Sequence, residues 1–311
     1  MRVTLLGGTG FIGHHVARWL VEADVEVTVI HRGQTPARLP SVRALTADRR
    51  DPSSLRAALA TAAPNVLIDM TAYDADDVVG LLRALPTSLE RLVVISSGDV
   101  YWTYAGFLGL MSAAPPTAAL DESAPLREQL YPYRGRARDV DDLLYRYDKI
   151  VVERAAQDGA DAAITILRLP MVYGPGDPHQ RVATHLKHFQ AGAQTFKLNP
   201  DEAAWRCTRG YVEDVAWAIQ LAALDDRAAG EVFNLGEADA LTQLEWVRAI
   251  AGAAEWPGTV LVESSEPVTL PANWQMPLIA DSSRIRRTLG FHERVGREEG
   301  LRRTVADQRE S

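Results

Sequence analysis

Two tyrosines stand just before a rare lysine in the segment LLYRYDKIVVE, residues 143–153. The chain has 33 basic residues, and only Lys149, Lys187 and Lys197 among them are lysines. A phenol beside an ammonium group can exchange a proton with the oxygen of an alcohol or carbonyl, because the positive charge stabilises the phenolate. Without such help the phenolate costs about 4 kcal/mol at pH 7. The segment therefore suggests acid/base chemistry.

Spacing decides which tyrosine this lysine can serve. The pattern of residues 140–158 predicts a helix. Residues four apart share a helix face, so Tyr145 would lie beside Lys149, while Tyr147 would point elsewhere. We predict Tyr145 as the acid/base and Lys149 as its electrostatic partner. The compact, multi-donor lysine head would also reach the ribose hydroxyls of a cofactor.

A hydroxyl partner for this pair should come from the end of a strand. The segment VVISSGDVYW, residues 93–102, supplies Ser96 and Ser97 directly after an apolar run. Each serine alone could equally be a solvated loop residue or a helix cap.

The glycine spacing near the N-terminus is typical of a dinucleotide site. Gly7, Gly10 and Gly13 follow a predicted strand and open a predicted helix in LLGGTGFIGHHVARWL, residues 5–20. The first glycine permits the tight turn, the second lets the backbone approach a pyrophosphate, and the third lets the helix pack closely. The free N–H groups and the dipole of the helix N-terminus favour the anion. The alternative is a purely structural turn.

The end of the second predicted strand indicates which dinucleotide binds. An acid at this place would hold the adenosine ribose of NAD, but the strand ends with His31 and Arg32. A guanidinium can pair with a 2′-phosphate. We therefore expect NADP in preference to NAD; the alternative is that Arg32 stacks on adenine or faces solvent.

Further contacts to the cofactor are expected after the third and fourth strands. Asp48 could accept a hydrogen bond from the adenine amino group, or it could cap the helix that begins near residue 53. Thr71 and Ala72 would lie along the cofactor.

The first half of the chain alternates short β-branched runs with helical patterns. Apolar runs predict strands at 3–6, 25–30, 42–45, 65–69, 91–96 and 163–168, with helices near 11–23, 53–62, 74–85 and 140–158 between them. This order predicts an α/β fold with a doubly wound parallel sheet, a Rossmann domain over residues 1–170.

After residue 170 the alternation stops, and the pattern predicts a smaller α-rich substrate-binding region over 171–311. Segments around 205–240, with a strand-like run at 231–235, could return to the first domain. More than forty residues separate the strand at 91–96 from the helix at 140, a long connection that is usually functional. Its apolar part, FLGLM at 107–111, either forms a short helix over the site or belongs to a surface excursion.

Composition excludes several classes of protein. A net charge of −8 argues against nucleic acid or an anionic membrane as the main partner. The single cysteine, Cys207, allows neither an internal disulfide nor a cysteine-based metal site. His179, His185 and His188 lack a carboxylate at suitable spacing, so no metal is expected. No apolar run is long enough for a signal peptide or a membrane span, and we expect a soluble, cytoplasmic protein.

In this order and spacing, five motifs together resemble the extended short-chain dehydrogenase/reductase family, in its NAD(P)-dependent epimerase/dehydratase branch. The motifs are GGTGFIG at 7–13, SSGDVY at 96–101, YRYDK at 145–149, LRLPMVYGPGD at 167–177 and RGYVEDVA at 209–216.

The resemblance implies a Ser–Tyr–Lys site beside a bound nicotinamide. Its hydroxyl falls on Ser97, its acid/base on Tyr145 and its lysine on Lys149. Val172 would contact the nicotinamide end. The resemblance also places Thr9, Phe11 and Ile12 in the cofactor-binding turn, and it implies a homodimer formed through the helix that carries the tyrosine and the helix before it.

Two more residues are implied to contact substrate. Arg209 matches an arginine that grips the phosphates of nucleotide sugars, and Asp99 matches an acid of the dehydratases, although Gly98 leaves the dehydratase acid pair incomplete. The insertion around 102–139 and the segment before Arg209 depart from the nucleotide-sugar members. We thus expect an NAD(P)-dependent enzyme that moves a hydride at a secondary-alcohol or carbonyl carbon, with a nucleotide sugar as one candidate substrate. The alternative is a non-catalytic NAD(P)-binding or sensing protein on the same fold.

Overall fold

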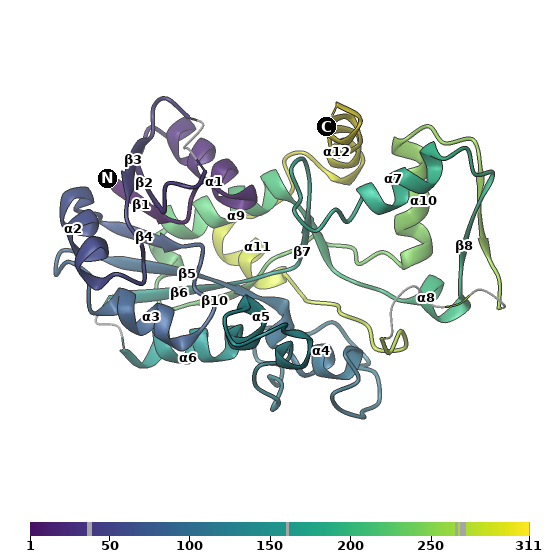
Figure 1. The fold of residues 1–311 in the computed structure, drawn as a ribbon, viewed down its shortest axis with the longest axis horizontal. Helices are drawn as coiled ribbons and strands as arrows, with labels where there is room; N and C mark the ends of the chain where they lie inside the picture. The colour runs from purple at the N-terminus through teal and green to yellow at the C-terminus, as the bar shows by residue number, and fades with distance from the viewer. Residues whose placement is uncertain (36–38, 160–161, 265–266, 268–271, 311) are drawn as a thin grey trace.

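The core of the molecule is a seven-stranded parallel sheet with the order β10-β6-β5-β4-β1-β2-β3 (Figure 1). The computed structural model describes residues 1–35, 39–159, 162–264, 267 and 272–310. The strands of the sheet are β1 (Arg2–Leu6), β2 (Glu26–His31), β3 (Arg43–Thr46), β4 (Val66–Asp69), β5 (Arg91–Ser97), β6 (Ala163–Leu169) and β10 (Val232–Asn234).

Helices cover both faces of this sheet, because its central strands are apolar on both sides. One face packs against α1 (Phe11–Glu22) and α9 (Val212–Leu224). The other face packs against α2 (Pro52–Ala62), α3 (Ala75–Leu82) and α6 (Lys149–Gly159). The predicted doubly wound α/β architecture is confirmed.

The chain leaves the sheet after β6 and later returns to it. β10 pairs in parallel with β6, and α9 lies against α1. Between and after these segments lies the region at the right of Figure 1, with α7 (Ala183–Gln190), α8 (Pro200–Ala204) and α10 (Gln243–Ala253). Two small parallel pairs, β7 (Met171–Tyr173) with β9 (Arg209–Tyr211) and β8 (Thr195–Leu198) with β11 (Thr259–Val262), complete this region.

The last helices attach the two regions to each other. α11 (Ser283–Leu289) packs on β10, and α12 (Arg297–Glu310) packs on α10 and α7. Among the residues that the structure describes, no helix is both long and apolar enough to cross a membrane.

The long connection after β5 contains little regular structure. It starts with the 3₁₀ turn η1 (Gly98–Val100) and α4 (Trp102–Phe107), and it ends with η2 (Arg134–Arg136) and the single helical turn α5 (Leu143–Arg146). Of the two alternatives for FLGLM, the short helix over 107–111 is wrong, because α4 ends at Phe107 and the chain turns at Gly109, whose φ is +73°.

The prediction of one helix over 140–158 is also wrong. α5 ends at Arg146 and α6 begins at Lys149. The cause is Asp148, whose carboxylate accepts a hydrogen bond from the backbone N–H of Ile150 at 2.8 Å, while its own carbonyl accepts from Val152. Asp is among the residues that most favour the position before a helix. Tyr147 therefore lies outside both helices in an extended conformation.

Candidate active site

A cavity of about 760 Å³ opens at the carboxyl ends of the central strands. Its walls come from the glycine-rich turn, the ends of β4 and β5, the insertion, and the segments around β7 and residues 278–280. This is the place where doubly wound sheets bind their ligands.

The glycine-rich turn lines one end of the cavity with backbone. Gly7 has a φ of +87°, and a Cβ at this position would lie 2.2 Å from Cγ2 of Thr71, so only glycine fits. Gly10 precedes α1 without a side-chain cap, and a Cβ there would meet nothing within 4 Å. The first N–H groups of α1 therefore face open space, and the turn fits the pyrophosphate of a dinucleotide.

Most of the residues expected to contact the cofactor lie around this end. Those that line the cavity are Gly7, Gly10, Phe11, Ile12, Gly13, Thr71, Lys149 and Val172. Thr9 lies half-buried in the turn itself. Ala72 is buried, and its backbone carbonyl accepts a hydrogen bond from Nζ of Lys149.

The expected adenosine contacts lie at the edge of the sheet. His31 ends β2, where its Nδ1 accepts a hydrogen bond from the backbone N–H of Gly33 at 3.0 Å. Arg32 is exposed beside it. Asp48 is exposed and accepts from the N–H of Arg50, so the alternative in which Asp48 caps the next helix is wrong. Asp51 caps α2 instead, because its Oδ1 accepts hydrogen bonds from the backbone N–H groups of Ser53 and Ser54.

Sequence reasoning missed the role of Arg49. Its guanidinium forms a two-pronged pair with Asp69 at 2.8 and 2.9 Å and donates to the hydroxyl of Thr71 at 3.0 Å. These contacts fix the loop after β4 against the glycine-rich turn. The signal available in the sequence was an arginine after β3 and an aspartate at the end of β4, which parallel pairing brings to the same edge.

Lys149 lies at the centre of the cavity floor and is only 4% exposed. Its Nζ donates hydrogen bonds to the carbonyls of Ala72 at 2.5 Å and Ile95 at 2.8 Å. An ammonium group has three donors, so one remains for a ligand. Burial lowers the pKa of Lys149 to about 8, and the nearby carboxylates oppose that shift. Glu153, four residues on, pairs with Arg168 and not with the lysine.

The expected neighbour of this lysine, Tyr145, does not reach the cavity. The break at Asp148 removes the shared helix face on which the prediction rested. The ring of Tyr145 instead packs under the guanidinium of Arg134, 4.6 Å from the ring centre, and its carbonyl accepts from the same side chain. The juxtaposition of Tyr145 and Lys149 is therefore wrong.

Tyr147 occupies the place that was expected for Tyr145. It lines the cavity, and the Nζ of Lys149 lies 5.9 Å from its ring centre. Its hydroxyl interacts with the Ser97 hydroxyl and the Asp99 carboxyl, and burial together with Asp99 raises its pKa well above the ordinary value. Tyr147 is therefore a neutral phenol at physiological pH and can give up a proton only to a strong base.

The two serines at the end of β5 have different surroundings. Ser96 is buried and donates to Glu153 at 2.5 Å, so its hydroxyl belongs to the core network of Arg168. Ser97 lines the cavity, and its Oγ accepts the backbone N–H of Asp99 at 3.2 Å. The geometry favours Ser97 over Ser96 as the ligand-facing hydroxyl.

Asp99 lies at the bottom of the cavity, 4% exposed. Its Oδ2 accepts a hydrogen bond from the hydroxyl of Tyr133 at 3.2 Å. Burial raises its pKa. Tyr133 and its neighbour Tyr104 both come from the insertion, which therefore covers the site. No motif in the sequence marked these two tyrosines, because the insertion has no regular pattern.

Arg209 does not line the cavity. Its guanidinium is buried against Trp246, 4.5 Å from the ring centre, and donates to Gln243 at 2.7 Å. The expectation that it faces the substrate is wrong in this structure, because the tryptophan and the glutamine hold its guanidinium away from the cavity lining. Burial lowers its pKa.

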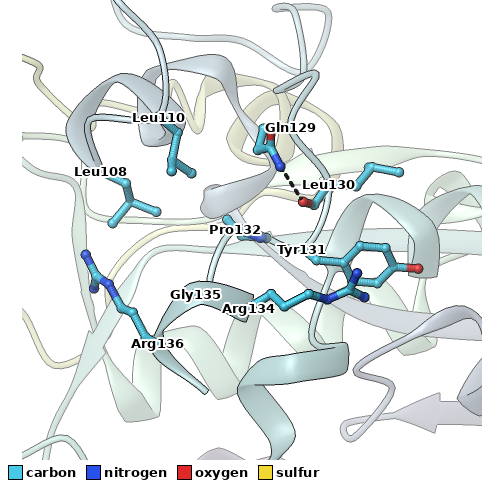
Figure 2. Close-up of a pocket in the computed structure, with 9 residues that line it drawn as sticks. All are labelled: Leu108, Leu110, Gln129, Leu130, Tyr131, Pro132, Arg134, Gly135 and Arg136. Carbon is cyan, nitrogen blue, oxygen red and sulfur yellow. Dashed lines mark hydrogen bonds between the residues drawn. The ribbon is translucent and has the colours of Figure 1, made fainter. Parts of the chain in front are cut away.

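A second pocket of about 470 Å³ lies within the insertion (Figure 2). In it, Arg134 extends over the ring of Tyr131, 4.0 Å from the ring centre, while Arg136 points away from that ring (Figure 2). Arg136 also lines the main cavity, so the two pockets share a wall.

Of the three histidines considered as metal ligands, His179 lines the main cavity. His185 and His188 lie on α7 and pack against Phe196. In the described part of the chain, no group of three His, Cys, Asp or Glu side chains could hold a metal ion.

The chain is similar to several known proteins. The chain is 29% identical over 297 residues to 2′-dehydrokanamycin reductase of Streptomyces kanamyceticus, covering 93% of this chain and 74% of that protein. It is 23% identical to the chloroplast stem-loop binding protein of 41 kDa b of Arabidopsis thaliana, covering 84% and 65%.

Solved structures share the fold. UDP-glucose 4-epimerase of Thermus thermophilus, solved with NAD, superposes with a TM-score of 0.72 at 22% identity, with 99% of each chain covered. A putative epimerase from Burkholderia cenocepacia gives a TM-score of 0.75 at 22% identity, covering 100% and 98%.

The model of the NAD dependent epimerase/dehydratase family matches residues 3–103 and 121–236. The gap between these two matched segments lies inside the insertion, whereas Tyr133 falls within the second matched segment. With more than half of the chain matched, this protein belongs to the NAD-dependent epimerase/dehydratase family.

Proposed function

We propose that the protein is an NAD(P)H-dependent reductase that converts a ketone to a secondary alcohol, with Tyr147 as the proton donor. The observation that carries this proposal is the convergence of Tyr147, Ser97 and Lys149 in one cavity that begins at the glycine-rich turn. A reduced nicotinamide, when bound, supplies the hydride for this chemistry.

The protein groups have separate tasks. Ser97 and Tyr147 hydrogen-bond the substrate oxygen, and Tyr147 gives it a proton as negative charge develops. The remaining N–H of Lys149 would hold the ribose of a bound cofactor, and its charge would stabilise the phenolate left on Tyr147. Ketone reduction starts from the neutral phenol of Tyr147, the form that burial and Asp99 favour.

The cofactor is proposed to be NADP rather than NAD. Arg32 is exposed at the end of β2, and no acidic residue follows it there to repel a 2′-phosphate. The N–H groups after Gly10 would bind the pyrophosphate.

The substrate is proposed to be a hydroxylated small molecule that binds without Arg209. Buried against Trp246 and outside the cavity lining, Arg209 gives no support to a diphosphate in this cavity. One relative is named a 2′-dehydrokanamycin reductase, so this amino-sugar ketone is the first substrate to test. A structural neighbour is a UDP-glucose 4-epimerase, so UDP-glucose is the nucleotide sugar to test beside it.

Two experiments test this function. The purified protein is denatured and its released small molecules are identified by mass spectrometry, and the native protein is assayed with NADPH against 2′-dehydrokanamycin and with NAD against UDP-glucose. We expect exchangeable cofactor and oxidation of NADPH by the ketone. Stoichiometric release of oxidised dinucleotide, with epimerisation of UDP-glucose, would contradict a reductase.

We further propose that the protein acts in the cytoplasm as a homodimer. The helices expected at the dimer interface correspond to α3 and α6, which pack side by side over one face of the sheet.

A further inference from the structure

Three tyrosines from three separate segments surround the carboxyl group of Asp99. Tyr104 belongs to α4, Tyr133 precedes η2, and Tyr147 lies between α5 and α6. The ring centres of Tyr133 and Tyr147 are 5.4 Å apart, and those of Tyr104 and Tyr133 are 6.3 Å apart. The hydroxyls of Tyr133 and Tyr147 both interact with the carboxyl of Asp99.

The backbone of Asp99 holds this carboxyl in place. Its N–H donates to Oγ of Ser97 at 3.2 Å, and its carbonyl accepts from Nε of Arg127 at 2.9 Å. One carboxyl oxygen accepts from Tyr133, while the other, Oδ1, is buried and lacks a well-formed hydrogen bond in the described part of the chain. An acid in such a position is oriented toward the cavity and has a free oxygen.

The two cations nearest Asp99, Arg127 and Lys149, lower its pKa, and each also binds other partners. Arg127 forms a buried pair with Asp148 at 2.6 Å, and Lys149 donates to two backbone carbonyls. The remaining groups that face Asp99 are the neutral phenols of Tyr133, Tyr147 and, behind them, Tyr104. Burial raises the pKa of the Asp99 carboxyl, although Arg127 and Lys149 oppose that shift.

We propose that Asp99 returns a proton to Tyr147 after each reduction, and that Tyr133 is a positioning residue that holds the Asp99 carboxyl for this transfer. This inference rests on the proposed reductase function. It gives the insertion a chemical role: Tyr133 lies outside the Ser–Tyr–Lys set and reaches the reaction only through Asp99.

The transfers balance. The Tyr147 O–H bond breaks as the substrate alkoxide gains its proton, which leaves a phenolate. The Asp99 O–H bond then breaks and the Tyr147 O–H bond forms again, which leaves a carboxylate hydrogen-bonded by Tyr133. Asp99 regains a proton from water that enters the open cavity before the next turnover. The hydride comes from the reduced nicotinamide, so one proton from solvent and one hydride are consumed per ketone.

The test compares Tyr133→Phe with Tyr131→Phe in the full-length protein with NADPH bound. Tyr131 lies two residues earlier in the same insertion, and its ring packs on Arg134 outside the main cavity (Figure 2). Three quantities are measured: NADPH affinity by fluorescence titration, kcat and its pH profile with 2′-dehydrokanamycin, and the infrared carbonyl band of the protonated Asp99, assigned by its loss in Asp99→Asn.

We expect Tyr133→Phe to lower kcat about tenfold and Asp99→Asn about a hundredfold, with NADPH affinity unchanged, because general acid/base groups contribute on this scale. Loss of the Tyr133 donor should also move the infrared midpoint of Asp99 to higher pH, since the hydrogen bond favours the carboxylate. Tyr131→Phe should resemble the wild-type protein in all three measurements.

An unchanged infrared midpoint and pH profile in Tyr133→Phe would overturn the inference. The infrared measurement needs no substrate, so it separates this result from failure of the proposed function. If the wild-type protein binds NADPH but reduces no ketone, the reductase proposal fails, while the coupling of Tyr133 to Asp99 is still measured.

Discussion

At the scale of residues, the site depends on which phenol lies near Lys149. Tyr145 has the helical spacing but packs under Arg134, whereas Tyr147 lies in the cavity with Ser97 and Asp99. The spacing rule holds only within one continuous helix, and Asp148 interrupts that helix. A single capping residue therefore decides which tyrosine reaches the cavity.

Lys149 leads to a prediction about pH. Its ammonium has a pKa of about 8, lowered by burial, so it loses its charge as the pH rises through that value. The neutral amine no longer stabilises the phenolate of Tyr147. We expect kcat/KM for ketone reduction to fall above pH about 8, and the pH profile of Lys149→Met to lack this alkaline decrease. A wild-type profile that stays flat across neutral and alkaline pH would rule out this role.

Arg32 determines the predicted preference for NADP. Arg32→Ala should weaken NADPH binding about 10- to 100-fold, the value of a charge-assisted contact of roughly 1.5–3 kcal/mol, and should leave NADH binding unchanged. Fluorescence titration with both dinucleotides measures the difference. Arg50→Ala, on the loop after β3, is the matched control. Equal loss for NADPH and NADH would show that Arg32 does not contact the 2′-phosphate.

At the scale of elements, a buried ion pair joins the insertion to the start of α6. Arg127 and Asp148 have fully buried side chains and are 2.6 Å apart, and Asp148 also accepts the N–H of Tyr131 at 2.6 Å. The same aspartate caps α6 and separates Tyr147 from Lys149. The insertion thus fixes the break on which the site depends.

Removing one partner of this pair should be costly. Arg127→Met leaves a buried, uncompensated carboxylate and should lower the free energy of unfolding by about 3–5 kcal/mol. The control is Arg138→Met, which removes an exposed arginine paired with Asp142 and should change stability by less than about 1 kcal/mol. Urea-induced unfolding measures both. Similar decreases in the free energy of unfolding of the two variants would show that the buried pair stabilises the fold no more than an exposed pair does.

Most strands and helices could be predicted from the sequence, but the contacts made by the insertion around 102–139 could not. Strands such as β4 and β5 are continuous apolar runs, and α1 follows a glycine turn, so local pattern was sufficient. The contacts of Tyr133 and Arg127 link segments 21 to 34 residues apart without periodicity. Such contacts depend on packing of an irregular chain, which no local rule predicts.

At the scale of the whole molecule, the parallel sheet and its cofactor end were predictable because each βαβ unit is a local pattern with one handedness. The return of β10 to the edge of β6 joins residues more than sixty apart in sequence and depends on the region between them. The burial of Arg209 depends instead on α10, which follows β10 in the chain, through Trp246 and Gln243.

The assembly can be measured directly. We expect a homodimer of the 34.1 kDa chain, formed through α3 and α6, because the family resemblance implies an interface at these helices. Light scattering at micromolar concentration checks the mass. A monomer at that concentration would contradict the expectation.

The most direct test of the whole account compares Tyr147→Phe with Tyr145→Phe in the NADPH-dependent ketone assay. Each substitution removes one hydroxyl and keeps the ring, so the packing on Arg134 or beside Lys149 is preserved. The account predicts that Tyr147→Phe lowers kcat by about 10²–10³, as expected for loss of a general acid. Tyr145→Phe should retain nearly full activity. The account would be contradicted if Tyr145→Phe lost activity while Tyr147→Phe remained active.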